Sequence, residues 1–484
     1  MTPNTPANHD VLILGAGLAG MAAALRLAER GLSVHLIETR KRLGGRASSF
    51  VDPATDLVLD QCQHAVMPAC THILDLYNRL GLTDVIEWHY NIHFSDGRNA
   101  IDTLRVDPLP APFHLTRSFL SMRGMSLGDK FAIARGMSRM LAMGASGRRR
   151  FRGTDIASLL KAWKQPDSAR RRFWDVIIIS ACNEIPENVD AELALKVFQE
   201  GFLASPQSVG VGLPRIPLID LYQPLENSIK AAGGSVELGT SAKRLLHNTE
   251  GCVTAVETTD GRTLHAPTVI TTLPPDRLAK LIDPDLADRD PRLRNLDQWT
   301  FSPIVAIHLF FDISSGPITK LPHLVTPDRP IDWVFNKGIT ELPPDATTSH
   351  HDPVQHLHAL KSGAHDLVSL SADEILTIAE REIRDALPGH PQHPVIHGRV
   401  IKEKVATFTA SPQLVHLRPS VTGPNANLLL AGDWVDTGWP ATMEGAVRSG
   451  YDAADAVLNQ RNLATLDRPD DMPATGLSRL LLNR

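Results

Sequence analysis

The stretch DVLILGAGLAGMAAALRLAERGLSVHLIE, residues 10–38, decides the fold class of this chain. It opens with an apolar run at 11–14, which is typical of a strand buried on both faces. A glycine-rich turn follows, and residues 21–30 then have the composition of a helix, which Gly31 ends. A second apolar run begins at residue 34. This order of strand, turn, helix and strand predicts a parallel α/β sheet.

The turn carries the pattern G-x-G-x-x-G, formed by Gly15, Gly17 and Gly20. The first glycine allows the tight turn, the second lets backbone N–H groups approach a pyrophosphate, and the third lets the helix pack closely on the strand. The helix start offers unpaired N–H groups to an anion. The pattern alone would also fit a tight turn in any α/β protein, but its place between strand and helix favours a dinucleotide. We expect the turn of this site to comprise Gly15, Ala16, Gly17, Leu18, Ala19 and Gly20.

An acidic residue and a second glycine turn follow. Glu38 ends the second strand about 20 residues after the glycines, where a carboxylate can accept ribose hydroxyls. The next turn reads GGR at 44–46 and resembles the GG doublet of the FAD-dependent amine oxidase and phytoene desaturase superfamily. The resemblance implies FAD as the cofactor, with the arginine near its phosphates, whereas the alternative is a basic surface loop. The residues expected here are Glu38, Thr39, Arg40, Gly44, Gly45 and Arg46.

The stretch LLLAGDWVDTGWPATMEGAVRSG, residues 428–450, resembles the closing motif of the same superfamily. An apolar strand leads into a loop, and a helix begins near Met443, so that backbone N–H groups at the helix start face an anionic flavin edge. By resemblance, Asp433 contacts the ribityl or phosphate part of FAD and the helix start contacts the isoalloxazine ring. The expected contacts are Gly432, Asp433, Thr442 and Met443.

Residues 234–270 alternate as short strands, separated by glycine turns at 250–251 and 260–261 that are typical of hairpins. In the superfamily this region returns to the FAD domain, and a backbone group near Ala242 would contact adenine. We therefore expect an α/β fold with a Rossmann-like FAD-binding domain and a second, mixed α+β substrate domain. The FAD domain would comprise 1–65, 208–275 and 420–460; the substrate and membrane-contact domain would comprise 66–207 and 276–419; and 461–484 would be a tail.

Composition sets further limits. The 484 residues carry a formal net charge of -5, which gives no overall attraction to nucleic acid. The four cysteines form no CxxC pair, and five histidines between 341 and 366 have no familiar ligand spacing, so we expect a loop without a metal. The N-terminus lacks the basic start of a secretory signal, and no uninterrupted apolar stretch is long enough to span a membrane. These features predict a cytoplasmic protein.

Two departures argue against an amine oxidase. Those enzymes usually carry a lysine, held to the flavin by water, where alignment places Ala306, and an aromatic residue where Thr442 stands. Three other stretches resemble the bacterial hydroxysqualene dehydroxylases instead, also called squalene-associated FAD-dependent desaturases. They are DQCQH at 60–64 for D-N-G-Q-H, the segments at 173–183 and 212–218, and the closing motif. The family has Asn and Gly where this chain has Gln61 and Cys62. Because glycine allows a nearer approach, the backbone of this chain would come less close to the flavin.

The resemblance implies that hydroxysqualene loses its hydroxyl group as water while its carbon receives a hydride from reduced FAD, which gives squalene. Because hydroxide is a poor leaving group, an acid should protonate it. His64 titrates in a suitable range and, with Gln63, is expected on the flavin face. Both residues could instead only orient the flavin. Asp436 is the other candidate acid, with helix capping or an exposed loop position as its alternative. The electron donor to FAD is not identified by the sequence.

Residues 114–152 mix nine basic side chains with apolar ones and contain one acid, Asp129. Such a mixture at helical spacing is typical of a segment on an anionic membrane surface, where a C30 isoprenoid would be collected. We expect contact with the inner face of the cell membrane, centred on Arg148, Arg149 and Arg150. The alternative is a packing helix with a solvated basic face.

Three other functions stay open. A carotenoid-type desaturase shares both FAD motifs and acts on a similar polyisoprene. A flavin amine oxidase shares the fold. A protein that holds FAD without catalysis, as a scaffold or lipid carrier, would show no reduction by any isoprenoid.

Overall fold

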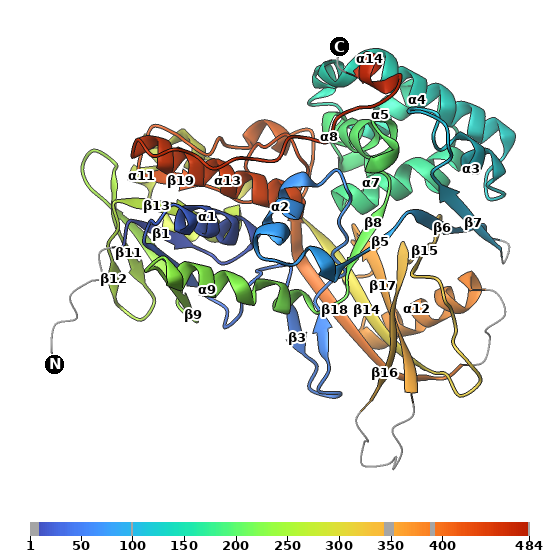
Figure 1. Ribbon diagram of the computed structural model, residues 1–484, viewed down its shortest axis with the longest axis horizontal. Helices are drawn as coiled ribbons and strands as arrows, with labels where there is room; N and C mark the ends of the chain where they lie inside the picture. The colour runs from blue at the N-terminus through green and yellow to red at the C-terminus, as the bar shows by residue number, and fades with distance from the viewer. Residues whose placement is uncertain (1–8, 98–99, 343–352, 388–392, 483–484) are drawn as a thin grey trace.

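The computed structural model describes residues 9–97, 100–342, 353–387 and 393–482. A five-stranded, wholly parallel sheet forms one end of the molecule (Figure 1). Its strands, in spatial order, are β19 (Leu428–Leu430), β13 (Thr268–Thr271), β1 (Val11–Leu14), β2 (Val34–Glu38) and β9 (Ser235–Leu238). Segments from the two ends and the middle of the chain thus share one sheet, which confirms the predicted α/β fold class.

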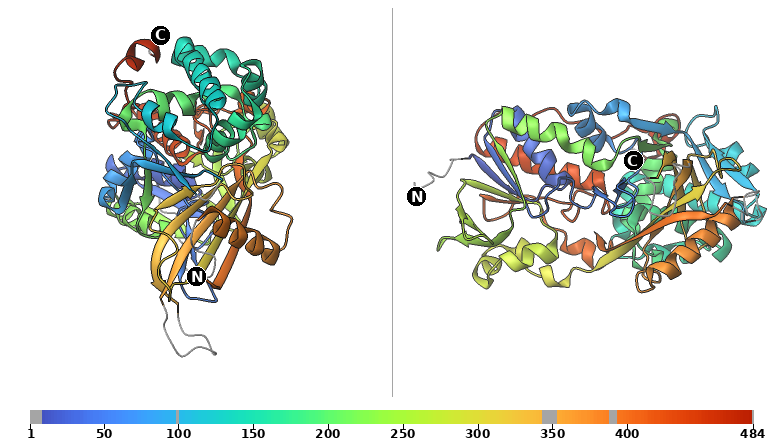
Figure 2. Two further views of the ribbon diagram at one scale, coloured as in Figure 1. Left: turned by 90° about the vertical axis from the view of Figure 1, so that its right-hand side faces the viewer. Right: turned by 90° about the horizontal axis from the view of Figure 1, so that it is seen from below.

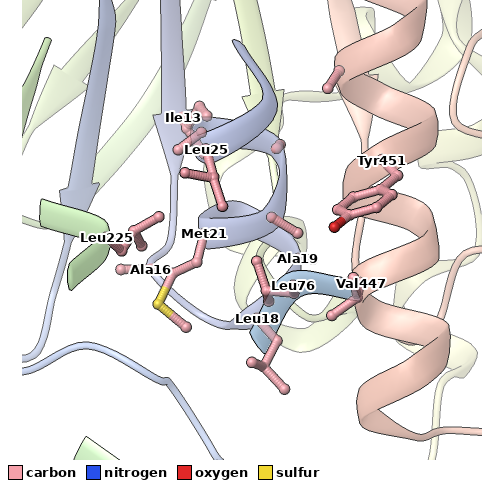
Figure 3. Packing of buried hydrophobic residues seen from close by; sticks show 14 of the residues in the cluster. Ile13, Ala16, Leu18, Ala19, Met21, Leu25, Leu76, Leu225, Val447 and Tyr451 are labelled. Carbon is pink, nitrogen blue, oxygen red and sulfur yellow. The ribbon is translucent and has the colours of Figure 1, made fainter. Parts of the chain in front are cut away.

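Helix α1 (Leu18–Glu29) packs against α13 (Met443–Gln460) beside this sheet, and Figure 3 shows Ala19 of α1 and Tyr451 and Val447 of α13 lying in the shared core. The two helices approach very closely. A Cβ atom added at Gly450 would lie 2.3 Å from the carbonyl oxygen of Ala19, so only glycine permits this approach. The N-terminal fingerprint and the closing motif are therefore held together by direct packing.

Antiparallel hairpins follow β9, as the glycine turns predict. Strands β10 (Ala242–His247), β11 (Val253–Thr258) and β12 (Thr263–Leu264) pair in order, and Gly251 and Gly261 have positive φ angles of 87° and 85°. Two further strand pairs lie between the ends of the molecule: β3 (Ser49–Val51) with β4 (Val58–Asp60), and β5 (Ile86–His89) with β8 (Val211–Pro214).

A second sheet of seven strands forms the other end of the long axis, together with a group of helices (Figure 2). It is antiparallel except where β15 runs parallel to β6. In spatial order its strands are β18 (Val395–Phe408), β14 (Phe301–Asp312), β17 (Pro353–Ser362), β16 (Trp333–Glu341), β15 (His323–Val325), β6 (Asn91–Ser95) and β7 (Ile101–Arg105). Helix α12 (Ala372–Ala386) packs on β18 and β14.

The expectation that residues 341–366 form a loop is wrong over much of its length, because β17 occupies 353–362 as an interior strand of this sheet. His356 and His358 point from β17 toward His308 of β14, and all three are buried. A histidine-rich composition favours a loop, but neutral imidazole rings can also stack on one another in a core, as these do. His350 and His351 lie outside the described residues, and the described part of the chain contains no group of ligands suited to a metal.

The helical region comprises α3 (Thr116–Ser121), α4 (Leu127–Gly147), α5 (Ile156–Ala162), α7 (Asp175–Cys182), α8 (Ala191–Phe198) and α14 (Ser478–Leu482). The C-terminal segment runs from α13 to this helical region. Arg26 of α1 donates hydrogen bonds to the carbonyls of Leu466 and Asp467 in this segment. Farther along, α14 packs on α4 with Leu482 buried. Among the described residues, no helix has the length and hydropathy needed to span a bilayer.

Candidate functional site

A cavity of about 950 Å³ lies at the carboxyl ends of β1, β2, β13 and β19. This edge is where parallel α/β sheets bind their ligands, because the loops after the strands diverge there. The cavity is lined by all the cofactor-binding residues expected from sequence except Ala16 and Gly20. Ala16 is fully buried, and Gly20 packs on the carbonyl of Gly15, so both shape the turn from behind.

The two glycine turns pair with each other at the wall of this cavity. The N–H of Gly44 donates to the carbonyl oxygen of Ala16 at 2.9 Å, and Gly17 and Gly44 form a parallel β-bridge. A Cβ atom at Gly45 would lie 3.1 Å from the Cα atom of Gly17. A Cβ atom at Gly17 itself would meet no protein atom within 4 Å. The open space beside Gly17 is thus a cradle that fits a phosphate group approaching the backbone.

Glu38 stands at the end of β2 with its carboxylate tied to the turn. Its two oxygens accept hydrogen bonds from the N–H groups of Ala16 and Arg40, each at 2.8 Å. Each carboxylate oxygen has a second lone pair, so the group can still accept hydroxyl donors from a ribose. Ala242 lines the same cavity at the start of β10.

The closing motif supplies the opposite wall. Arg46 donates to Asp433 at 2.6 Å and to the carbonyl of Ala406 at 2.8 Å. Thr442 is the N-cap of α13, and its hydroxyl accepts the N–H of Gly445 at 3.2 Å. The carboxylate of Glu444 accepts the N–H groups of His72 and Ile73 at the start of α2 (Thr71–Arg79). Thr442, Met443 and Glu444 line the cavity, so the N-terminus of α13, with its unpaired N–H groups, borders it.

Beyond this region the cavity continues into an apolar chamber. It passes between Phe94 of β6, Ile177 of α7 and the paired rings of Trp333 and Phe335 on β16. These two rings stack with centroids 5.4 Å apart and an interplanar angle of 5°. Ala306, at the position aligned with the amine oxidase lysine, is buried and packs with Phe335. The chamber thus presents mainly carbon surface.

Comparison with known proteins agrees with this geometry. The family model for flavin-containing amine oxidoreductases matches residues 18–458. The chain belongs to this family. FAD is accordingly its cofactor, and the open space at Gly17, the acid at the end of β2 and the N-terminus of α13 fit that molecule.

Two curated relatives match this flavoprotein along nearly its whole length. It is 26% identical to the 15-cis-phytoene desaturase of Synechococcus elongatus over 469 residues, which cover 93% of this chain and 96% of the relative. It is also 26% identical to the hydroxysqualene dehydroxylase of Sinorhizobium fredii over 471 residues, with coverages of 94% and 99%. The fold matches a putrescine oxidase with a TM-score of 0.69 at 17% identity, covering 94% of this chain and 99% of the other.

The loop after β4 carries the residues expected on the flavin face, and the structure places Gln63 and His64 at the cavity. Nδ1 of His64 lies 3.0 Å from the carbonyl oxygen of Cys62, so this nitrogen carries a proton. Nε2 is then the nitrogen left to act on a ligand. Burial lowers the pKa of His64, so its imidazole is mainly neutral at neutral pH.

The surroundings of Asp436 argue against its expected role as an acid. Asp436 is not among the residues that line the cavity, and its carboxylate accepts from Arg152 at 2.8 Å and lies 4.0 Å from Arg418. Burial alone would raise the pKa of Asp436, but the two arginines outweigh it and lower the pKa. The group therefore stays ionised and holds the closing loop in place.

Lys196 and Lys337 lie at or near the cavity, and no motif in the sequence predicts either of them. Lys196 of α8 lines the cavity, with Nζ 2.7 Å from Glu200 and 4.8 Å from the ring centroid of Trp439, and burial lowers its pKa. Lys337 of β16 donates hydrogen bonds to Asp60, at the end of β4, and to Gln63 in the loop that follows. The short sequence around each lysine resembles an ordinary surface helix or strand, so no local pattern could have marked them.

Proposed function

We propose that this flavoprotein is a hydroxysqualene dehydroxylase, which converts hydroxysqualene to squalene at the expense of reduced FAD. The observation that carries this proposal is that the FAD site and a mainly apolar chamber share one cavity, whose wall also carries Gln63 and His64. A full-length relative of that name supports it. The absence of a lysine at the aligned position, where Ala306 is buried against Phe335, argues against an amine oxidase.

Bound reduced FAD supplies a hydride and, over the full cycle, a proton, so that a C–O bond is exchanged for a C–H bond and water. The chain's own part begins with the hydroxyl group. We propose that protonated His64 donates from Nε2 to the leaving oxygen, while the Cys62 carbonyl holds the ring through Nδ1. Gln63 lies beside it as a neutral hydrogen-bonding group.

Loss of the hydroxyl leaves an allylic-type cation, which needs a dry and polarisable environment. The stacked rings of Trp333 and Phe335 supply aromatic faces to the chamber, and such faces attract cations by about 0.5–2 kcal/mol. The carbon-lined wall excludes water that would capture the cation again. The chamber therefore favours hydride capture over return to the alcohol.

Product analysis tests this proposal. Holoenzyme reduced by dithionite without oxygen should convert hydroxysqualene to one equivalent of squalene per FAD. Oxidised holoenzyme should leave phytoene unchanged. Desaturation of phytoene with no squalene formed would instead make the protein a carotenoid-type desaturase. This is the second candidate because the phytoene desaturase relative is equally similar to this chain. Peroxide release with amines would indicate an amine oxidase.

We also propose that the protein collects this substrate from a membrane through an apolar tip on α3 and α4. Figure 1 shows both helices at the end of the molecule away from the parallel sheet. Leu127 and Phe131 lie one turn apart on α4 and are 80% and 72% exposed, and Lys130 between them donates to the carbonyl of Leu120 on α3. The tip comprises Leu120 on α3, Leu127 and Phe131 on α4, and Phe113 just before α3; Arg117 and Arg123 of the same segment are also exposed.

This proposal moves the centre of the expected membrane contact from Arg148–Arg150 to the other end of α4. Arg148 is engaged in an ion pair with Glu200 at 2.8 Å and donates to Gln199, so it is not a free surface charge. Arg152 pairs with Asp436. The basic cluster near residue 150 thus holds α4 to its neighbours in part. The large exposed apolar side chains lie at the opposite end of α4, where the membrane would be met.

A further inference from the structure

Lys337 connects the seven-stranded sheet to the loop that faces the cavity. It stands in β16 at a register shift between Asn336 and Gly338, where an extra residue interrupts the pairing with β17. Its Nζ atom lies 3.2 Å from Oε1 of Gln63 and 3.3 Å from Oδ2 of Asp60. A single ammonium therefore holds both the end of β4, at Asp60, and the loop after it, at Gln63.

This contact determines which end of the Gln63 amide faces Lys337. An ammonium has three donors and no acceptor, so the atom of the amide that meets it must be the oxygen. The NH2 group is then the end directed away from Lys337. Within the described part of the chain, no protein acceptor takes a hydrogen bond from this NH2 group, and Gln63 lines the cavity.

Asp60 makes this arrangement rigid and electrically neutral. Its Oδ1 atom accepts from the hydroxyl of Ser49 at 2.8 Å and from the N–H of Leu218 at 3.0 Å, and its carbonyl oxygen accepts from Nε2 of His308 at 3.0 Å. Its carboxylate also balances the charge of Lys337. The NH2 end of Gln63 thus faces the cavity with no net positive charge behind it. Such a charge would repel a developing cation.

We propose that Lys337 orients the Gln63 amide so that its NH2 group donates to the hydroxyl oxygen of the substrate, which makes the site selective for an oxygenated isoprenoid over a hydrocarbon. This inference rests on the proposed function and adds a positioning residue to it. A fixed donor stabilises the oxygen as its bond to carbon breaks, whereas an amide free to turn would offer its carbonyl oxygen equally well. The contribution should therefore appear in the C–O cleavage step.

The test compares holoenzymes of wild type, Lys337→Met, Lys337→Arg and the control Lys320→Met, whose side chain is exposed on a loop. Each is reduced without oxygen and mixed with hydroxysqualene, and flavin reoxidation is followed. We expect Lys337→Met to lower the limiting rate of reoxidation about tenfold, which corresponds to one hydrogen bond, while the hydroxysqualene concentration that gives half this rate stays nearly unchanged. Lys337→Arg, which keeps a donor, should restore most of the rate, and Lys320→Met should match wild type.

Reoxidation by molecular oxygen separates this role from an effect on the flavin, because it breaks no C–O bond. Unchanged oxygen rates and flavin spectra in Lys337→Met would support the inference. Equal slowing with oxygen and with hydroxysqualene would overturn it, since Gln63 would then act on the flavin.

Binding to oxidised holoenzyme, followed by flavin absorbance, distinguishes this inference from the proposed function. We expect wild type to bind hydroxysqualene more tightly than squalene and Gln63→Met to lose that preference. Selective binding without turnover would refute the dehydroxylase while supporting the role of Gln63. Equal binding of alcohol and hydrocarbon by wild type would overturn the inference whatever the true substrate is.

Discussion

The guanidinium group of Arg46 lies 2.6 Å from the carboxylate of Asp433, although 387 positions separate the two residues in the chain. Both residues line the cavity, one after the GG doublet and the other in the closing motif. The pair therefore closes the FAD site across two segments that are brought together only by folding. Asp433 is largely buried, so salt screens this ion pair less than it would screen one on the surface.

We expect Asp433→Asn to weaken FAD binding about tenfold or more, because the change leaves the charge of Arg46 without its partner at the cavity wall. Titration of apoprotein with FAD, followed by quenching of flavin fluorescence, measures this. Asp288→Asn, at an exposed position outside the cavity, is the matched control and should bind FAD as wild type does. Equal affinity in both variants would show that the pair does not support the cofactor.

Two glycine substitutions should separate cofactor binding from folding. Gly17→Ala places a methyl group in open space with an ordinary φ of -74°, so the apoprotein should keep its melting temperature while FAD affinity falls at least tenfold. Gly20→Ala would put Cβ 2.0 Å from the carbonyl oxygen of Gly15, and such overpacking costs about 1–3 kcal/mol or more. Thermal unfolding of the two apoproteins checks this. A lower melting temperature for Gly17→Ala, or unchanged affinity, would contradict the phosphate cradle.

The pH dependence of turnover should report His64. Burial lowers the pKa of His64 below its ordinary value of 6.5, and the proposed acid is the protonated form. The rate with hydroxysqualene should therefore rise as pH falls through neutrality and level off only below 6.5. His64→Gln should lower the rate and remove this rise while retaining FAD. The same pH profile in wild type and variant would exclude His64 as the acid.

Membrane binding should depend on the apolar tip. We expect Leu127→Asp combined with Phe131→Asp to abolish co-sedimentation with vesicles that contain anionic lipid, because a charge cannot enter the acyl boundary without cost. Ile339→Asp changes a residue that is 61% exposed on β16 and is the matched control. Arg149→Gln should weaken binding only slightly, since Arg149 lies at the other end of α4. Full binding by the double variant would place the contact elsewhere.

Local patterns predicted the parts of the fold that depend on neighbouring residues. The glycine turn of 15–20, the acid at the end of β2 and the hairpins near Gly251 and Gly261 each require particular residue types at short spacing, so short windows of sequence were enough to identify them. The histidines of β17 could not be interpreted in the same way. Their environment consists of rings from β14, which no short window of sequence contains.

The candidate site divides along the same line. The sequence by itself determined that the chain binds a dinucleotide at the glycine turn and, through its resemblances, that this is FAD. Only the tertiary structure decided that Asp436 faces two arginines and that Lys337 supports Gln63 from another sheet. The physical reason is that a charge acts through its distance to other charges. That distance is set by the packing of elements hundreds of residues apart, whereas a turn or a helix start is set by the residues within it.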